Sequence, residues 1–421
     1  MQHSGTDGIL DTAAIRPSDY AAAALVVVFA MYVRYMFRDF ITSDYTNFTS
    51  LWYAAVQQHG FAAAGTPVSN YTPPYLYLLF LTSAAFPHLP PVMAVKIPSI
   101  AFDLVCAAAV FLIVRMRYGS GLVPLWAALT VLIAPTVVCN SGLWGQADSI
   151  YAAFLLICIM LLMQGRGALA MIAFALALSI KFQSMFLAPA LCAFWLRRLI
   201  RFWHLLLVPA VYALAMAPAW LEGRPASELA TVYMNQSVTY HSLSKDAPNL
   251  YLWLPDRFYD PLAIAGVLLM AAIGVYYVWC VVRSRARLDA PLILKLCLLS
   301  VLMTPFFLPK MHDRFFFVAD VTAIAYAFYF PRQYPVAIMI SFASFFAYQR
   351  FLFHYTLVPL KVLPIVMGAA LLIVAASTKR SLDEASSESA PVASGRHDQP
   401  MRRSLRRIKG GSCRESRHIS R

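Results

Sequence analysis

Charged residues are scarce in this sequence. Only 13% of its 421 residues are charged, whereas 60% are hydrophobic and the mean hydropathy is +0.64. Soluble globular domains carry about 25% charged residues, so this composition lies far outside their range. It predicts an all-α polytopic membrane protein.

Cysteine pairs and short catalytic motifs are also lacking. Six of the seven cysteines lie in or at the edges of apolar segments and Cys413 lies in the tail, so no loop holds a pair. We therefore expect no disulfide framework. The sequence has no HExxH, CxxC, Walker, GxSxG or GxGxxG motif in a fitting context, so none of the chemistries that these motifs support is indicated.

Positive charge is confined to a few places. The net charge of +14 is concentrated in short loops between apolar segments and in the tail, and no Lys or Arg occurs between Asp39 and Thr72. Loops that stay in the cytoplasm carry the Lys and Arg excess of a membrane protein, so the charge reflects orientation and we expect no nucleic-acid partner. The N-terminus lacks the features of a cleaved signal peptide, and the first apolar run is expected to be a retained anchor.

The apolar runs predict about twelve transmembrane helices, since each needs about 20 residues. The run from 167 to 196 carries Lys181 and Gln183 at its centre, and we expect it to form a hairpin of two short helices because a straight helix would place Lys181 at mid-membrane. The other ten runs are 19–37, 92–114, 121–138, 149–164, 201–221, 261–282, 291–309, 314–331, 334–351 and 357–377.

The apolar segment 75–86 is too short to span a membrane and is bounded by prolines, so we expect an interfacial or re-entrant helix. If it does not cross, every strongly basic short loop falls on the cytoplasmic side. The prediction is a cytoplasmic N-terminus (1–18), a membrane-embedded domain (19–377) with outer loops 38–91 and 222–260, and a disordered, basic cytoplasmic tail (378–421). Arg34 and Arg38, at the outer end of the first helix, are exceptions to the charge rule.

The unusual polar residues fall on the predicted outer face. They are Asp44, Tyr71, Gln146, Asp148, Lys181, Gln183, Lys310, His312 and Arg314. Asp44 precedes an amphipathic stretch in which Phe48, Leu51, Trp52, Ala55 and Val56 recur at helical spacing. It would either cap that helix or act as a general base.

Two further clusters also allow two interpretations. Asp148 could cap the following helix, but Gln146 beside it offers both a donor and an acceptor to a sugar. Lys310, His312 and Arg314, in "FLPKMHDRFFF", are either snorkelling anchors or a phosphate site.

Two acids fall inside predicted spans. Asp103 and Asp320 are costly in hydrocarbon, so they should face the interior of the bundle and form structural pairs. Lys96 lies seven residues before Asp103, on the same helix face.

The order of these features resembles that of the membrane-embedded GT-C glycosyltransferases. "NYTPPY", "NSGLWGQADS", "ALALSIKFQSMFLAPAL" and "LPKMHDRFFF" follow an acid in the first outer loop. Within that superfamily the chain resembles bacterial mannosyltransferases related to the second mannosyltransferase of GPI-anchor synthesis, over residues 19 to 377. Asp44-Tyr45 departs from the Asp-Glu pair of protein O-mannosyltransferases, which disfavours a protein acceptor.

The resemblance implies a GT-C bundle with interfacial helices in the first outer loop, a polyprenyl-phosphate sugar donor and inversion at the anomeric carbon. It also implies an active site on the extracytoplasmic face of the inner membrane, with Asp44 as the base and without a metal or other cofactor. In this interpretation Lys310, His312 and Arg314 bind the donor phosphate, while Tyr71, Gln146, Asp148, Lys181 and Gln183 bind substrate. The alternatives are a transporter or lipid-linked sugar flippase and a non-catalytic scaffold of a glycan-assembly complex.

Overall fold

The computed structural model describes residues 16–237 and 241–388, and most of them are helical. A single parallel pairing joins β1 (Ser244–Lys245) to β2 (Met311–His312). The α-helices are α2 (Pro17–Met36), α3 (Ser50–His59), α4 (Pro73–Ala85), α5 (Pro91–Ala94), α6 (Ile97–Tyr118), α7 (Leu122–Ile133), α8 (Pro135–Val137), α9 (Asp148–Met163), α10 (Gly167–Leu178), α11 (Ala188–Leu196), α12 (Phe202–Leu205), α13 (Leu207–Leu221), α14 (Ala226–Ser237), α15 (Tyr259–Arg283), α16 (Ala290–Phe307), α17 (Phe317–Tyr329), α18 (Tyr334–Phe353) and α19 (Leu363–Glu388).

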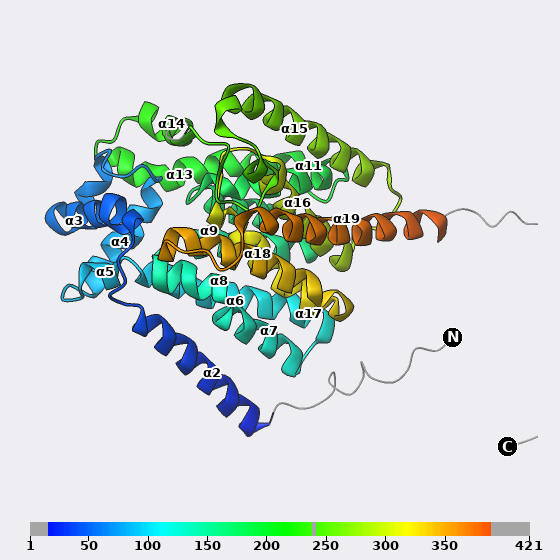
Figure 1. The fold of residues 1–421 in the computed structure, drawn as a ribbon, viewed down its shortest axis with the longest axis horizontal. Coiled ribbons are helices and arrows are strands. Elements are labelled where there is room, and N and C mark those ends of the chain that lie inside the picture. Colours follow the sequence, from blue (N-terminus) through cyan, green and yellow to red (C-terminus); the bar gives the residue numbers. More distant parts are fainter. Residues whose placement is uncertain (1–15, 238–240, 389–421) are drawn as a thin grey trace, which may run out of the picture.

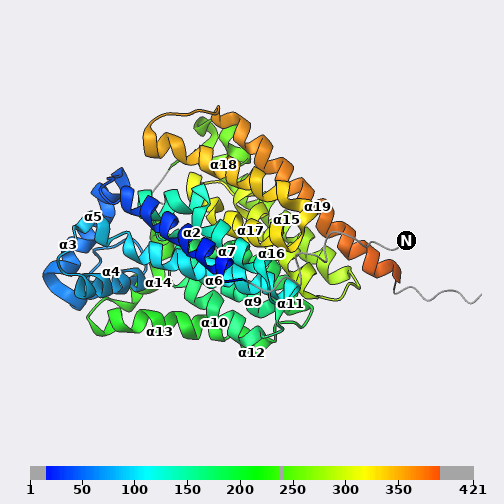
Figure 2. The ribbon, with the colours of Figure 1, turned by 90° about the horizontal axis from the view of Figure 1, so that it is seen from below.

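Helix α9 lies at the centre of the bundle. Almost all of its side chains are buried, and it packs against α6, α10, α16 and α17. Helices α2 and α15 lie at the periphery (Figures 1 and 2) and expose large apolar side chains, among them Phe29 and Val275. An apolar exterior around an apolar core is the pattern of a helix bundle solvated by lipid.

Within the described ranges, seven helices are long and apolar enough to cross a membrane, and α7 together with the segment Pro135–Trp144, which begins with α8, would make an eighth. That pair bends by 43° where Pro135 follows Ala134, because proline cannot donate the helical hydrogen bond. The other predicted spans occur as helices of 16 residues or fewer, including α9, α10 and α17. The multi-pass helical architecture is confirmed, whereas the number of about twelve spans remains a prediction.

The run 167–196 forms two helices, as predicted. Helix α10 ends at Leu178, the chain is extended at Lys181, and a short 3-10 turn (Phe182–Leu187) leads into α11. The break therefore falls at the charged residue that motivated the hairpin.

The segment 38–91, predicted to be the first outer loop, contains helices α3, α4 and α5. Helix α4 starts with Pro73 and Pro74, which suit the first turn of a helix, and its 13 residues are too short to span. Together with α14, these helices gather at one end of the bundle (Figure 1). The predicted apolar stripe is only partly correct: Trp52 and Val56 are buried, but Leu51 is 59% exposed.

The C-terminal helix extends beyond the predicted start of the tail at residue 378. Helix α19 continues to Glu388, and Ser381 accepts a hydrogen bond from Lys295 Nζ at 2.8 Å. Helix α19 therefore includes residues 378–388, the first eleven residues of the predicted tail, while the disorder of the tail stays a prediction. Residues 389–421 of the predicted tail and 1–15 of the predicted N-terminus lie outside the described residues, and the sidedness of the termini remains a prediction.

Candidate active site

A cavity of about 300 Å³ lies where the first outer loop meets the ends of the central helices. Its walls come from α3, the turn before α9, the break after α10, and the segments around β1 and β2. All but one of the residues predicted for the site line this cavity; the exception is Asp148. Those that line it are Asp44, Tyr71, Gln146, Lys181, Gln183, Lys310, His312 and Arg314. The structure thus brings these separate segments together, although their roles remain predictions.

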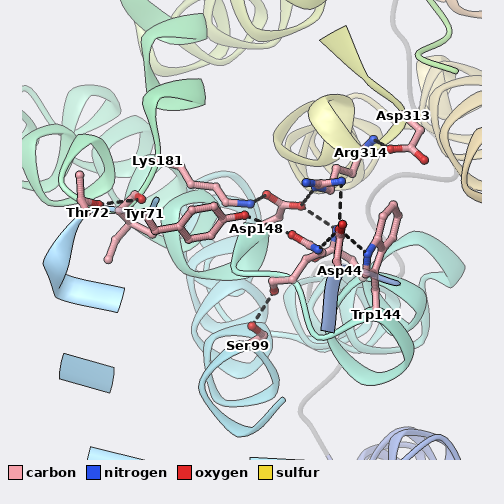
Figure 3. A network of polar contacts seen from close by, with 12 residues as sticks. Asp44, Tyr71, Thr72, Ser99, Trp144, Asp148, Lys181, Asp313 and Arg314 are labelled. Carbon is pink, nitrogen blue, oxygen red and sulfur yellow. Dashed lines mark hydrogen bonds and ion pairs between the residues drawn. The ribbon is translucent and has the colours of Figure 1, made fainter. Parts of the chain in front are cut away.

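Asp44 does not cap a helix. Its side chain makes no capping hydrogen bond to the short helix that follows it. Its Oδ2 atom instead accepts hydrogen bonds from Gln146 Nε2 at 2.7 Å and Trp144 Nε1 at 3.0 Å, and lies 3.5 Å from Arg314 NH1 (Figure 3). The capping alternative is therefore wrong. The carboxylate is held by donors from the opposite wall while it keeps access to the cavity.

Asp148 lies behind the cavity wall. It is fully buried, and its two oxygens accept hydrogen bonds from Lys181 Nζ at 2.6 Å and Asn140 Nδ2 at 2.9 Å. It makes no capping hydrogen bond to α9, so that interpretation is also wrong. In this structure Asp148 orients Lys181 toward the cavity. Asp148 itself is not among the described residues that line the cavity, so its predicted contact with substrate stays a prediction.

Arg314 joins the two carboxylates. Its guanidinium lies 3.5 Å from Asp44 and 3.9 Å from Asp148, and it stacks at 5.0 Å over the ring of Trp144. These contacts fix a positive charge on the cavity wall next to Asp44 (Figure 3). The sequence did not single out Trp144, although it occurs inside the motif "WGQADS".

Aromatic rings form another part of the wall. Tyr71 OH donates a hydrogen bond to Gln146 Oε1 at 3.4 Å, and Lys181 Nζ lies 5.0 Å from the Tyr71 ring centroid. Trp52 packs against Tyr71 with ring centroids 5.0 Å apart. Rings flanked by amide and ammonium groups are suited to hold a sugar, whose faces are apolar and whose edge is hydroxylated.

Residues of the long outer loop complete the cationic wall. Strand β1 places Lys245 beside His312 of β2, and Lys310 N donates a hydrogen bond to Leu243 O at 2.7 Å. Lys245 lines the cavity. No sequence motif marks it, because its position depends on a two-residue strand pairing across more than sixty residues of chain.

The field in this part of the cavity is positive. Burial lowers the pKa of His312 well below its usual range, and the neighbouring charges of Arg314, Lys245 and Lys181 lower it further. Burial and Arg314 also lower the pKa of Lys245. His312 is therefore neutral at pH 7, and the cavity wall around it favours an anion.

Asp313 points away from this cationic wall. It is 4% exposed and accepts a hydrogen bond from Arg314 N at 2.9 Å. Burial raises its pKa to about 7, although Arg314 acts in the opposite direction. Its ionisation therefore changes near neutral pH.

A buried ion pair supports the segment that carries Gln146. Arg34 Nε and NH2 donate to Asp103 Oδ2 at 3.0 and 2.8 Å, and both residues are almost completely buried. Ser141 and Ser149 donate to the two oxygens of Asp103. One carboxylate thus holds both sides of the turn between 141 and 149.

This pairing corrects one inference and explains an exception. Lys96 does not pair with Asp103, because its Nζ donates to the carbonyls of Phe37 and Phe40 at 2.6 and 2.9 Å. Arg34 departs from the charge rule of membrane loops because it is a buried partner of Asp103 and not a loop cation. Asp320 is buried, as predicted, but neither of its carboxylate oxygens has a hydrogen-bond partner among residues 16–237 and 241–388, so the predicted structural pair is not seen.

No group of three or more His, Cys, Asp or Glu side chains within residues 16–237 and 241–388 is arranged to hold a metal ion. The expectation of a metal-independent site therefore remains a prediction.

Comparison with known proteins places the fold. No protein-family model and no curated protein sequence matches the chain. Among solved structures, the crystal structure of ArnT from Cupriavidus metallidurans bound to undecaprenyl phosphate matches with a TM-score of 0.51 and 14% identity, over 87% of this chain and 78% of ArnT. The chain has the fold of ArnT. Because ArnT is a GT-C glycosyltransferase, the sequence resemblance to that superfamily is supported at the level of the fold, whereas the mannosyltransferase subgroup is not.

Proposed function

We propose that this chain is an inverting glycosyltransferase that moves a hexose from a polyprenyl-phosphate sugar to a hydroxyl group of a glycan, lipid or other acceptor. The observation that carries the proposal is the pairing of Asp44 with Arg314 at 3.5 Å in the wall of one cavity. The fold of ArnT, whose crystal structure contains undecaprenyl phosphate, supports a polyprenyl-phosphate donor. Mannose rests on the sequence resemblance alone.

The reaction step uses the charges of the cavity. Asp44 takes the proton of the acceptor hydroxyl while the acceptor oxygen attacks the anomeric carbon from the face opposite the phosphate. The bond between that carbon and the phosphate oxygen breaks, and its electron pair leaves with the polyprenyl phosphate, which gains one negative charge. Arg314, Lys310 and Lys245 stabilise that charge, and His312 offers a hydrogen bond. This step requires no oxidant, reductant or cofactor.

The sugar lies between the aromatic and amide groups. Tyr71 and Trp52 pack against the ring, while Gln146 and Gln183 bind hydroxyl groups. Lys181 is held in place by Asp148 at 2.6 Å. Asp148 then affects sugar binding mainly by orienting Lys181, which refines its predicted role.

The proposed location is the inner membrane, with both termini in the cytoplasm and the cavity on the extracytoplasmic side. Fusion of a periplasm-active reporter after Glu222 and after Lys379 tests this topology. Activity at the first position and none at the second is expected, and the reverse result contradicts it.

Transfer of a radiolabelled hexose from a polyprenyl-phosphate sugar by the purified protein tests the proposed reaction. A covalent product that depends on Asp44 is expected. Vesicles reconstituted with the protein separate the other classes: movement of the lipid-linked sugar across the bilayer without a covalent product would indicate a flippase. Neither movement nor product, with intact glycan assembly in an Asp44→Asn strain, would indicate a scaffold.

A further inference from the structure

A second, basic pocket lies at the opposite ends of the helices that carry the candidate active site. The start of α9 and the end of α10 reach the catalytic cavity, whereas the turn from α9 into α10 and the turn after α11 line the second pocket. This pocket has a volume of about 640 Å³ and is lined by Gly165, Arg166, Gly167, Ala168, Leu169, Arg198, Leu199, Arg201 and His204. Figure 2 shows α12, which follows Arg201, at the edge of the bundle beside α10.

The pocket is strongly cationic. The chain from 165 to 204 contains no Asp or Glu. Arg197 turns inward, where it donates to the carbonyls of Val281 and Ala286 at 2.7 Å each. The neighbouring arginines 166, 198 and 201 line the pocket instead. Positive charge in cytoplasmic loops explains their presence, but it does not explain why they surround one concavity.

The backbone conformation of Arg198 is a second feature that the orientation of the protein in the membrane does not explain. Arg198 has φ of +61° at the end of α11, a conformation that strongly favours glycine. Its N–H donates to Trp195 O at 2.9 Å, so the conformation is fixed by the turn that ends the helix. An arginine at a position suited to glycine keeps a charge at the cost of backbone strain.

The opposite wall of the pocket is closely packed. A Cβ atom at Gly167 would lie 2.9 Å from His204 Nδ1 and 2.9 Å from Leu199 O, so α10 and the turn after α11 approach closely there. Arg201 N donates a hydrogen bond to His204 Nδ1 at 3.3 Å. Because that nitrogen accepts, Nε2 is the ring nitrogen that donates. The pocket therefore combines three guanidinium groups and an imidazole donor on short, packed turns.

Aromatic side chains locate the pocket relative to the membrane. Phe202 and Trp203, which follow Arg201 directly, are 55% and 72% exposed. Exposed Trp beside an apolar helix is typical of the level of lipid headgroups. The basic pocket thus opens at the height where phospholipid phosphates lie.

We propose that this pocket binds the headgroup of an anionic phospholipid from the leaflet opposite the catalytic cavity. Guanidinium groups bind phosphate through paired hydrogen bonds, and basic pockets between membrane helices are suited to anionic headgroups. The concavity accommodates a headgroup between the turns, while the acyl chains lie along the apolar surface beside Trp203. The inference does not depend on the proposed transferase activity.

Lipid binding by the full-length protein in detergent tests the proposal. The probe is dioctanoyl phosphatidylglycerol, with dioctanoyl phosphatidylcholine as the neutral comparison, and bound lipid is counted by native mass spectrometry. We expect at least 10-fold tighter binding of phosphatidylglycerol than of phosphatidylcholine. The triple variant R166Q/R198Q/R201Q should lose that preference.

A matched variant controls for total charge. R115Q/R283Q/R332Q removes the same number of exposed arginines from loops predicted to lie on the same side, and it should keep the preference. Equal loss in both triple variants would show diffuse attraction and overturn the site. Displacement of the lipid by millimolar inorganic phosphate alone would show a small-anion pocket and would also overturn it.

Arg198→Gly covers the case in which the triple variant fails to fold. Glycine relieves the strain at a positive φ, so the single variant should unfold at the same temperature as the wild type or higher. It should nevertheless bind phosphatidylglycerol several-fold more weakly. Unchanged binding by a folded Arg198→Gly protein would overturn the assignment of Arg198.

Discussion

Asp44→Asn is the most informative single change. Asparagine has the shape of aspartate, and its carbonyl oxygen can still accept from Gln146 or Trp144, which donate to Asp44 at 2.7 and 3.0 Å. The fold should therefore survive. The amide cannot take a proton, so kcat should fall by the rate factor that a general base contributes, about 100- to 10,000-fold. That range corresponds to about 3 to 5 kcal/mol in the activation free energy.

The effect on KM separates a base from a structural ion pair. In the proposed complex, Asp44 and the donor phosphate share the guanidinium of Arg314, which lies 3.5 Å from Asp44. Asparagine removes that competing charge, so KM for the polyprenyl-phosphate sugar should stay the same or decrease. If Asp44 only positioned Arg314, the variant would mainly raise KM and leave kcat nearly unchanged.

The assay is transfer of a radiolabelled hexose at varied donor concentration, with the thermal unfolding midpoint as a check on folding. Asp39→Asn is the matched control, because Asp39 is an acid of the same loop that lies 3.2 Å from Arg38 and has a 73% exposed side chain. Asp39→Asn should leave kcat and the donor KM unchanged. Full turnover by a folded Asp44→Asn protein refutes the assignment of Asp44 as the base.

Four other changes test the remaining parts of the site. Arg314→Gln should lower kcat by about 100- to 1,000-fold, since it removes charge stabilisation of the leaving phosphate; unchanged kcat in the transfer assay contradicts this. Lys245→Gln should raise the donor KM by about 5-fold, because a partly exposed charge contributes about 1 kcal/mol, and the effect should shrink in high salt; a salt-independent KM argues against it. Asp103→Asn leaves Arg34 buried without its charged partner and should cost about 3 to 5 kcal/mol of stability, seen as a lower unfolding midpoint. Replacing both residues by Met should recover most of that loss, and a double variant as unstable as Asp103→Asn contradicts this prediction. Burial raises the pKa of Asp313 to about 7, against about 3.9 when unfolded. The contribution of this one group to stability is therefore fully present below about pH 4 and is lost as the pH rises to about 7, by about 4 kcal/mol. Asp313→Asn should flatten that part of the pH profile of the unfolding midpoint, and an unchanged profile excludes the mechanism.

The sequence predicts the site where chemistry follows from local motifs. Lys310, His312 and Arg314 lie in one short segment. Asp44 and Gln146 occur in turns that the distribution of Lys and Arg among the loops predicts to lie on the same side of the membrane. Their convergence in one cavity was therefore predictable. The contacts between these residues could not be predicted, because they depend on how the loops pack.

Buried pairs were harder to predict than exposed loops. Seven-residue spacing favoured Lys96 as the partner of Asp103, whereas the structure pairs Asp103 with Arg34 from another helix. Spacing along one helix describes neighbours on that helix only, and tertiary packing supplies closer partners. Lys245 is a similar case, because its place in the cavity depends on the pairing of β1 with β2.

The pair Arg34–Asp103 also bears on how the protein enters its membrane. Arg34 and Asp103 lie on different helices and are 2% and 0% exposed. Asp103 lies inside α6, and a charge at the centre of a helix costs about 2.5 to 3.5 kcal/mol to insert alone, whereas Arg34 is buried near the end of α2. When α2 leaves the translocation machinery before α6 has been made, Arg34 has no carboxylate to meet. Biogenesis should therefore hold α2 near the machinery until α6 arrives, and the turn that carries Gln146 should be assembled only after both have come together.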